Sequence, residues 1–193
     1  PEYSGLLVVE NPATSSPGLA FMMATIAEFG ESGWLDWWQA MKENNVAIVS
    51  DWETAYYTNF SGSSGNGPHP MVVSYASSPA AELIYAESEL SESPTASLVS
   101  PGMCWRQVEF AGILKNTPNR ALAEKFIDFM LSQEFQEDVP MQMFVFPVLP
   151  EAVLLEDFVI ASQIPETVAS LDPDLISANR DAWVNDWTNL MLK

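Results

Sequence analysis

Cysteine and histidine are almost absent from this chain of 193 residues. Cys104 is the only cysteine, which excludes an internal disulfide and a cysteine metal cluster. Because it lies between Met103 and Trp105, we expect it to pack as a small hydrophobic side chain. His69 is the only histidine and lies in a turn rich in glycine and proline, so we expect a solvated loop residue and no histidine metal site.

Basic residues are also scarce. The chain has 7 lysines and arginines against 26 aspartates and glutamates, which gives a formal net charge of -19. A field of this sign repels nucleic acid and anionic membrane surfaces and favours cationic ligands. Solubility or a salty habitat would favour the same acidity, so composition alone leaves both interpretations open.

Long apolar runs and several well-known enzyme motifs are missing. No run is long and apolar enough to span a bilayer. The sequence has no Gly-x-Ser-x-Gly motif, no Walker loop and no glycine-rich dinucleotide turn. Hydrophobic residues nevertheless make up 48% of the chain, enough to build a core in one large domain or two small lobes.

The pattern of apolar residues predicts alternating strands and helices. Strands are predicted at residues 6–9, 46–49, 71–75 and 107–114. Helices are predicted at residues 17–29, 34–43, 52–60, 78–85, 119–132 and from residue 172 onward, and Gly30 separates the first two. This alternation indicates an α/β fold with a largely parallel sheet.

The loops that follow the first three strands carry the polar and aromatic side chains of interest. Ligands of parallel sheets bind in such loops, at the carboxyl ends of strands. The first loop ends in Thr14, Ser15 and Ser16. Ser16 is a good N-cap and Pro17 fits the first helical position, so this loop forms either a seat for an anionic or polar group or an ordinary capped helix.

Aromatic and acidic side chains occupy the other two loops. Trp52 and Tyr75 beside carboxylates suit a flat cationic ligand, with each contact worth about 0.5–2 kcal/mol, although core packing is the alternative. Asp51 and Glu53 could act as a general acid and base. We favour a structural role, in which Asp51 caps the helix and Glu53 complements its dipole. Five other tryptophans are spaced as core or interface residues: Trp34, Trp37, Trp38, Trp183 and Trp187.

Several segments together resemble a known family. They read VENPATSSPGL at residues 9–19, DWETAY at 51–56 and VSYASSPA at 73–80. The similarity continues in order with QVE at 107–109, AEKFIDFMLS at 123–132, FVFPV at 144–148 and NRDAW at 179–183. This combination resembles the thiamine-binding subfamily of the extracytoplasmic solute-binding proteins of ABC transporters.

The resemblance implies a type 2 periplasmic-binding-protein fold. Such a protein has two α/β lobes, each a three-layer αβα arrangement with a mixed, largely parallel sheet, and clamps its ligand between them. The implied ligand is thiamine or a thiamine phosphate, with no cofactor, metal or catalytic residue. The implied partner is a membrane ABC permease. The implied location is periplasmic or extracytoplasmic, with membrane association through the importer or a lipid anchor.

The resemblance also implies a division of the chain. Residues 1–105 would be the second lobe with the ligand-facing loops. Residues 106–193 would be a crossover strand and C-terminal helices that normally pack on the first lobe and hinge. Because the family's N-terminal lobe has no counterpart here, we expect a fragment of a longer protein. Apolar surface left uncovered would favour self-association.

The family's binding positions carry over unevenly. Ser15, with its neighbour Ser16, matches the position that meets the phosphate or hydroxyethyl end of the ligand. Trp52 and Tyr75 match aromatics that line the thiamine rings. Phe144 stands where the family has a ligand tryptophan. Ala81 stands where it has a ligand tyrosine, so the identity of the ligand stays open.

Other functions remain to be weighed. Ferric iron or a polyamine could be the solute, and Tyr56 and Tyr57 are adjacent tyrosines of the kind that iron receptors use. We expect these two side chains to point to different helix faces, which weakens that alternative. A hydrolase that uses Asp51 and Glu53, and an interaction module without any small ligand, are the remaining alternatives.

Overall fold

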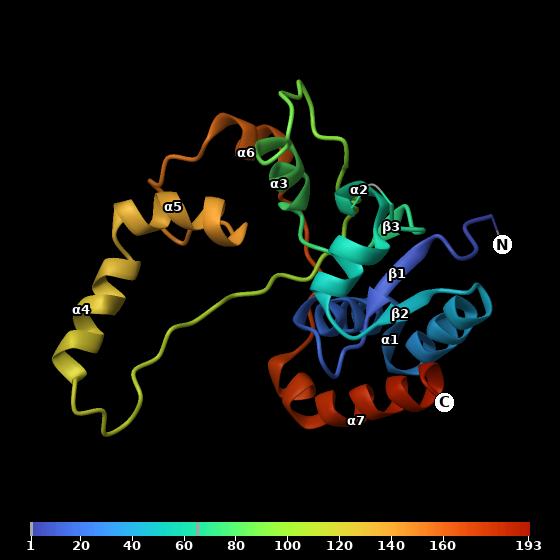
Figure 1. Cartoon of the computed structure of the whole chain (residues 1–193). Helices are drawn as coiled ribbons and strands as arrows, with labels where there is room; N and C mark the ends of the chain where they lie inside the picture. Colours follow the sequence, from blue (N-terminus) through green and yellow to red (C-terminus); the bar gives the residue numbers. More distant parts are fainter. Residues whose placement is uncertain (1, 65) are drawn as a thin grey trace. The chain divides into compact units, whose positions relative to one another are not determined.

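A computed structural model describes residues 2–64 and 66–193 and divides into two compact units (Figure 1). The first unit comprises Pro1–Tyr75, Leu98–Arg106 and Ile164–Lys193, and the second comprises Ala76–Ser97 and Gln107–Gln163. The predicted boundary at residue 105 does not coincide with these units. The assignment of residues 1–105 to a second lobe, and of residues 106–193 to a crossover strand and C-terminal helices, stays a prediction.

The first unit is built on a parallel sheet whose strands were all predicted. These are β1 (Leu7–Glu10), β2 (Ala47–Val49) and β3 (Met71–Val72), and their order is β2-β1-β3. Val8 pairs with Ala47 on one side and with Val72 on the other, and both pairings are parallel. Because β1 lies in the centre, Val8 and Val9 are completely buried.

The helix α1 (Ser16–Glu43) follows β1 and contains a kink. Gly30 interrupts it with φ 71° and ψ 169°, a backbone conformation that glycine adopts without a side-chain penalty. The sequence predicted two helices separated at this glycine, and the structure confirms that separation.

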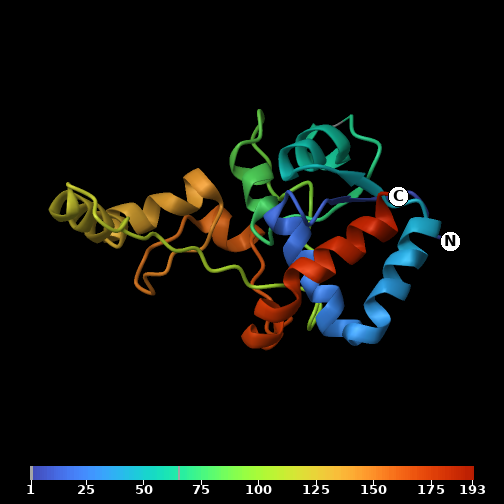
Figure 2. The ribbon, with the colours of Figure 1, turned by 90° about the horizontal axis from the view of Figure 1, so that it is seen from below.

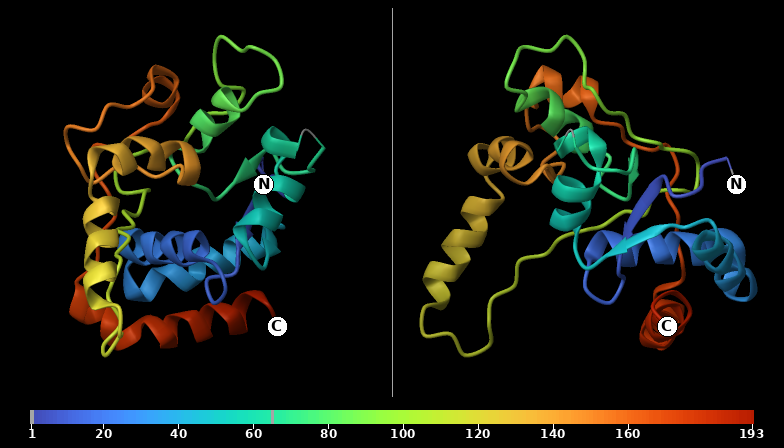
Figure 3. Two further views of the ribbon diagram at one scale, coloured as in Figure 1. Left: turned by 60° about the vertical axis from the view of Figure 1, so that its left-hand side comes forward. Right: turned by 45° about the vertical axis from the view of Figure 1, so that its right-hand side comes forward.

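The helix α7 (Pro173–Met191) packs against α1 (Figures 2 and 3). It begins as predicted after Asp172, whose carboxylate accepts a hydrogen bond from the Asp174 N–H at 2.8 Å. The rings of Trp38 and Trp187 meet edge to face with centroids 5.4 Å apart. The core around them consists of buried apolar side chains: Val9, Met22, Met23, Ile26, Trp34, Trp38, Trp183, Trp187 and Met191. The predicted core role of these tryptophans is confirmed.

The segment after β2 is a π-helix, η1 (Thr54–Asn59), where the sequence predicted an ordinary helix. The Phe60 N–H donates to the Ala55 carbonyl, five residues back, at 2.9 Å. Residues 61–70 are rich in serine and glycine, which predicts a surface loop. This segment begins with the short α2 (Ser61–Ser64), and Gly65 lies outside the described residues. His69 is not a free loop residue, because its Nδ1 lies 2.9 Å from the Gly5 carbonyl and its backbone pairs with Phe60.

The second unit contains four helices. They are α3 (Ser78–Ile84), α4 (Arg120–Met130), α5 (Gln133–Met143) and α6 (Glu156–Ala161). α3 packs on α6, whose Phe158 is completely buried. The buried Gln136 of α5 donates to the Met130 carbonyl at 2.7 Å and accepts from the Val148 N–H at 2.7 Å. This side chain therefore joins the end of α4 to the chain after α5.

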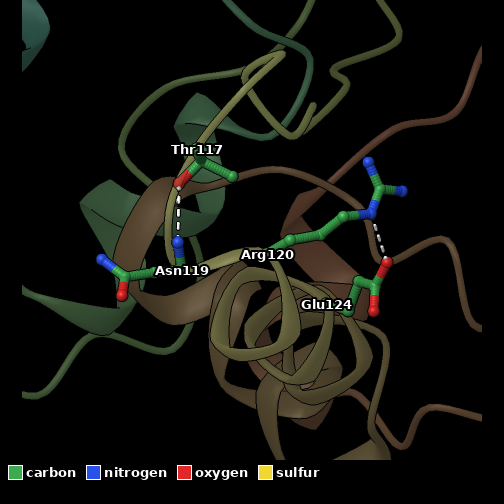
Figure 4. Close-up of polar contacts among 4 residues, drawn as sticks. All are labelled: Thr117, Asn119, Arg120 and Glu124. Atoms are coloured by element: carbon green, nitrogen blue, oxygen red, sulfur yellow. Dashed lines mark hydrogen bonds and ion pairs between the residues drawn. The ribbon is translucent and has the colours of Figure 1, made fainter.

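Two predictions for this unit are wrong. Residues 107–114 form an extended segment without strand pairing in the described structure (Figure 1). The apolar periodicity of residues 119–132 predicts a helix with Leu122, Phe126 and Phe129 facing inward, but these side chains are exposed in α4. Local contacts hold its first turn: the Asn119 N–H donates to Thr117 Oγ1 at 3.3 Å, and Arg120 pairs with Glu124 at 2.8 Å (Figure 4).

None of the described helices has both the length and the apolar character needed to cross a lipid bilayer.

Candidate functional site

The loops at the carboxyl ends of β1, β2 and β3 are joined by hydrogen bonds. Thr14 Oγ1, in the loop after β1, donates to the Ser50 carbonyl after β2 at 2.5 Å. Trp52 Nε1, further along the loop after β2, donates to Ser74 Oγ after β3 at 2.9 Å. The three loops that the sequence selected therefore lie at one edge of the sheet, as parallel strands require.

Ser15, and not Ser16, is the N-cap of α1. Ser15 has extended backbone angles, and its hydroxyl accepts from the Gly18 N–H at 3.4 Å. The predicted N-cap was one residue too late, because Pro17 fits the second helical position as well as the first. The consequence for chemistry is that the Ser15 hydroxyl is buried in the cap. Ser16 is exposed in the first turn, at the positive end of the helix dipole.

Gly18 allows α1 to begin directly against the end of β1. A Cβ at this position would lie 2.5 Å from the Glu10 carbonyl oxygen and 2.9 Å from its carbonyl carbon. Any larger residue would push the first turn away from the strand. Glycine at this position therefore fixes where the exposed N–H groups of α1 lie relative to the other two loops.

Asp51 is engaged in capping the helical turn after β2. Its Oδ1 accepts from the Thr54 N–H at 2.8 Å and its Oδ2 from the Ser50 hydroxyl at 2.5 Å. These hydrogen bonds, the Ser50 hydroxyl first, hold the pKa of Asp51 below its ordinary value. A carboxylate held in this way stays ionised at neutral pH and is a poor general acid. These hydrogen bonds agree with the interpretation in which Asp51 caps the helical turn.

Three aromatic rings contact Trp52. Tyr56 stacks on it with centroids 4.8 Å apart and an interplanar angle of 18°. Tyr57 meets it edge to face at 5.4 Å, and Tyr75 lies tilted at 5.7 Å. Tyr56 and Tyr57 were expected to point to different helix faces. Both contact Trp52, because a π-helical turn holds more residues than an α-helical one.

Glu10, at the end of β1, is a buried carboxyl group that the sequence reasoning missed. Its side chain is 1% exposed, and neither carboxylate oxygen has a hydrogen-bond partner among the described residues. Burial raises the pKa of Glu10 to about 8, and the charge of Asp51 adds to the shift. Its signal in the sequence is a lone acidic residue at the end of an otherwise apolar strand.

Phe144 belongs to the second unit and is the C-cap of α5. Its backbone is left-handed, with φ 54°, and its carbonyl accepts a hydrogen bond from the Ser77 hydroxyl. Its ring meets Tyr85 edge to face at 5.8 Å. The structure thus shows what holds Phe144 in place, while its contact with a ligand stays a prediction.

Acidic, cysteine and histidine side chains do not converge anywhere in the described part of the chain in a group of three or more that could hold a metal ion. The adjacent tyrosines, for their part, differ in accessibility, since Tyr56 is buried and Tyr57 exposed.

Comparisons with known proteins identify relatives over nearly the whole chain. Residues 1–179 match the model of the family described as bacterial extracellular solute-binding protein. The chain is 27% identical over 181 residues to a thiamine-binding periplasmic protein of Brucella suis. The aligned region covers 94% of this chain and 51% of that protein. Proteins with the same name from Salmonella typhimurium and Escherichia coli are 29% and 28% identical over the same length, each covering 94% of this chain and 52% of the relative.

A solved structure supports the fold. The chain matches a periplasmic thiamin binding protein with a TM-score of 0.76 and 24% sequence identity, over 97% of this chain and 55% of that one. The predicted fold class, α/β of the type 2 periplasmic-binding kind, is therefore confirmed. The chain spans about half the length of the relatives it matches.

Proposed function

Since the chain belongs to the bacterial extracellular solute-binding protein family, we propose that it is the ligand-binding part of an ABC importer's receptor and that the solute is thiamine or a thiamine phosphate. The curated relatives carry that solute in their names. Within the chain, the supporting observation is the joining of three strand-end loops, because it brings a helix N-terminus and an aromatic cluster to one edge of the sheet.

The two ends of the ligand would meet different chemistry. The first-turn N–H groups of α1 and the exposed Ser16 hydroxyl suit the phosphate or hydroxyethyl end. Ser15 would hold that turn in place through its cap. The rings of Trp52 and Tyr75 would stack on the flat cationic part, where the net charge of -19 adds a favourable field.

The remaining parts of the proposal follow from the family. The relatives are named as binding proteins, so we propose binding and delivery without catalysis, to a membrane permease and from the periplasm. A lipid anchor or the importer itself would hold the full-length protein at the membrane. Phe144 remains a proposed ligand-binding residue, as the family resemblance implies. The exposed apolar side chains of α4 would favour self-association in this chain on its own.

The test is calorimetric titration with thiamine and thiamine phosphate, of this chain and of the longest natural form of the protein. We expect binding that is tighter in the longer form. Spermidine, a cation without a flat ring, is the control solute and should bind weakly. Absence of heat from thiamine and its phosphate in both forms would overturn the proposal.

Two variants assign the ends of the ligand. Trp52→Ala should weaken both ligands, because it removes the ring on which the flat cation stacks. Ser16→Ala should weaken thiamine phosphate more than thiamine, because only the phosphate needs an additional donor. Equal losses for both ligands in Ser16→Ala would remove the assignment of the α1 N-terminus to the phosphate.

A further inference from the structure

The orientation of the Trp52 ring is fixed on two sides. Its Nε1 donates to Ser74 Oγ at 2.9 Å, and Tyr56 stacks on it at 4.8 Å. Tyr56 is only 3% exposed, so it supports the indole from inside the protein. The part of the indole that remains accessible is therefore presented in one orientation, without the entropy cost of ordering a free side chain.

The π-helix brings a second tyrosine to the same indole. In an α-helix with 3.6 residues per turn, residues four and five positions beyond Trp52 lie at clearly different angles around the axis. The wider turn of η1, shown by the bond from the Phe60 N–H to the Ala55 carbonyl, sets Tyr56 and Tyr57 on either side of that position. Their centroids lie 4.8 Å and 5.4 Å from that of Trp52. Such turns are frequent at functional sites.

The two outer rings of this cluster face solvent to different degrees. Tyr57 is 56% exposed and Tyr75 is 37% exposed, and each packs against Trp52. A large exposed aromatic that contributes little to the core stabilises the fold only weakly, because most of its apolar area stays in water. The exposure of Tyr57 therefore leaves its ring available to a ligand.

The charge around the cluster selects the kind of ligand. Asp51 and Glu53 flank Trp52 in the sequence, and the hydrogen bonds to Asp51 keep its pKa low, so it carries a negative charge at neutral pH. Aromatic faces attract cations through their quadrupoles, and adjacent carboxylates add to that attraction. A flat cation satisfies both features of the surface, whereas a neutral ring satisfies only one.

We propose that Tyr57 is a specificity-determining residue of the ligand site, contributing a third aromatic ring, beside Trp52 and Tyr75, to the recognition of a flat heteroaromatic cation. The inference rests on the proposed solute-binding function. It extends that function to a residue that neither the motifs nor the strand-end positions indicated.

The experiment compares Tyr57→Ala with Tyr57→Phe by titration of the longest natural form with thiamine. Tyr57→Ala should weaken binding about 3- to 30-fold, and Tyr57→Phe should stay within about twofold, because stacking and cation–π contact need the ring and not the hydroxyl. Tyr3→Ala is the matched control, because Tyr3 is 63% exposed and lies in the same unit. The protein with this substitution should bind thiamine with unchanged affinity.

A second probe separates cation recognition from apolar contact. The aminopyrimidine half of thiamine, which lacks the cationic thiazolium ring, should lose less affinity in Tyr57→Ala than thiamine does. Thermal unfolding of each variant identifies a loss caused by misfolding. If Tyr57→Ala folds and binds thiamine like the unaltered protein, the inference is overturned and the proposed function stands. If the unaltered protein does not bind thiamine, both are overturned.

Discussion

Replacing Glu10 with glutamine should stabilise the first unit by an amount that grows with pH. The carboxyl group is buried without a hydrogen-bond partner among the described residues, and its pKa is raised from 4.5 to about 8. A buried carboxylate without partners pays a desolvation cost that the neutral acid largely avoids. The folded chain therefore keeps the proton on Glu10 at pH values at which the unfolded chain releases it.

The magnitude follows from linkage. Below pH 4.5 both states hold the proton, and Glu10 costs the fold nothing by ionisation. As the pH rises from 4.5 towards 8, the unfolded state is favoured by about 1.4 kcal/mol per pH unit, which amounts to roughly 3 kcal/mol at pH 7. Above the folded-state pKa both states are ionised, and the penalty stays constant. Glutamine is neutral throughout and escapes the penalty.

Urea unfolding followed by tryptophan fluorescence is the appropriate assay, because all seven tryptophans lie in the first unit. The difference in unfolding free energy between Glu10→Gln and the unaltered chain should increase by roughly 3 kcal/mol between pH 4.5 and pH 7. Glu53→Gln, at an exposed position, is the charge-matched control, because it removes one carboxylate without removing a buried one. A difference for Glu10→Gln that does not change with pH would refute the reasoning.

Two further substitutions test packing in the first unit, both measured by the same urea unfolding. Gly18→Ala should destabilise it by about 1–3 kcal/mol despite the better helix propensity of alanine, because the new Cβ would lie 2.5 Å from the Glu10 carbonyl oxygen; a gain in stability would contradict that contact. Thr25→Val should cost about 1–3 kcal/mol, because the buried Trp38 Nε1 would lose its acceptor at 3.0 Å, whereas Thr25→Ser should retain most of the stability.

The parts of the fold that the sequence predicted correctly are set by short-range chemistry. Asp172 before proline at residue 173 predicted the start of α7, and Gly30 predicted the break in α1, since both depend on the local backbone alone. The strand-end loops were found in the same way. The alternation of strands and helices indicates a parallel sheet, and a parallel sheet gathers these loops at one edge.

The errors concern what lies against each element. The apolar periodicity of α4 predicts that the helix has an apolar face, but it does not show whether another element packs on that face. Phe126 lies on this face and is exposed. Residues 107–114 have strand-like composition, but a strand exists only when a neighbour pairs with it. The π-helix escaped detection because its single extra residue per turn leaves almost no trace in the pattern. The unpaired state of Glu10 depends on contacts distant in sequence.

The pairing of α1 with α7 has a consequence for how the first unit acquires its structure. Trp38 and Trp187, in contact at 5.4 Å, are separated by most of the chain, with the whole second unit between them in sequence. Such non-local contacts slow folding, because loop closure must precede the gain from packing. During synthesis, residues of the second unit emerge from the ribosome before α7 does. The tryptophan core can therefore form only when translation has reached residue 187, and until then α1 exposes half of an unfinished interface that chaperones can recognise.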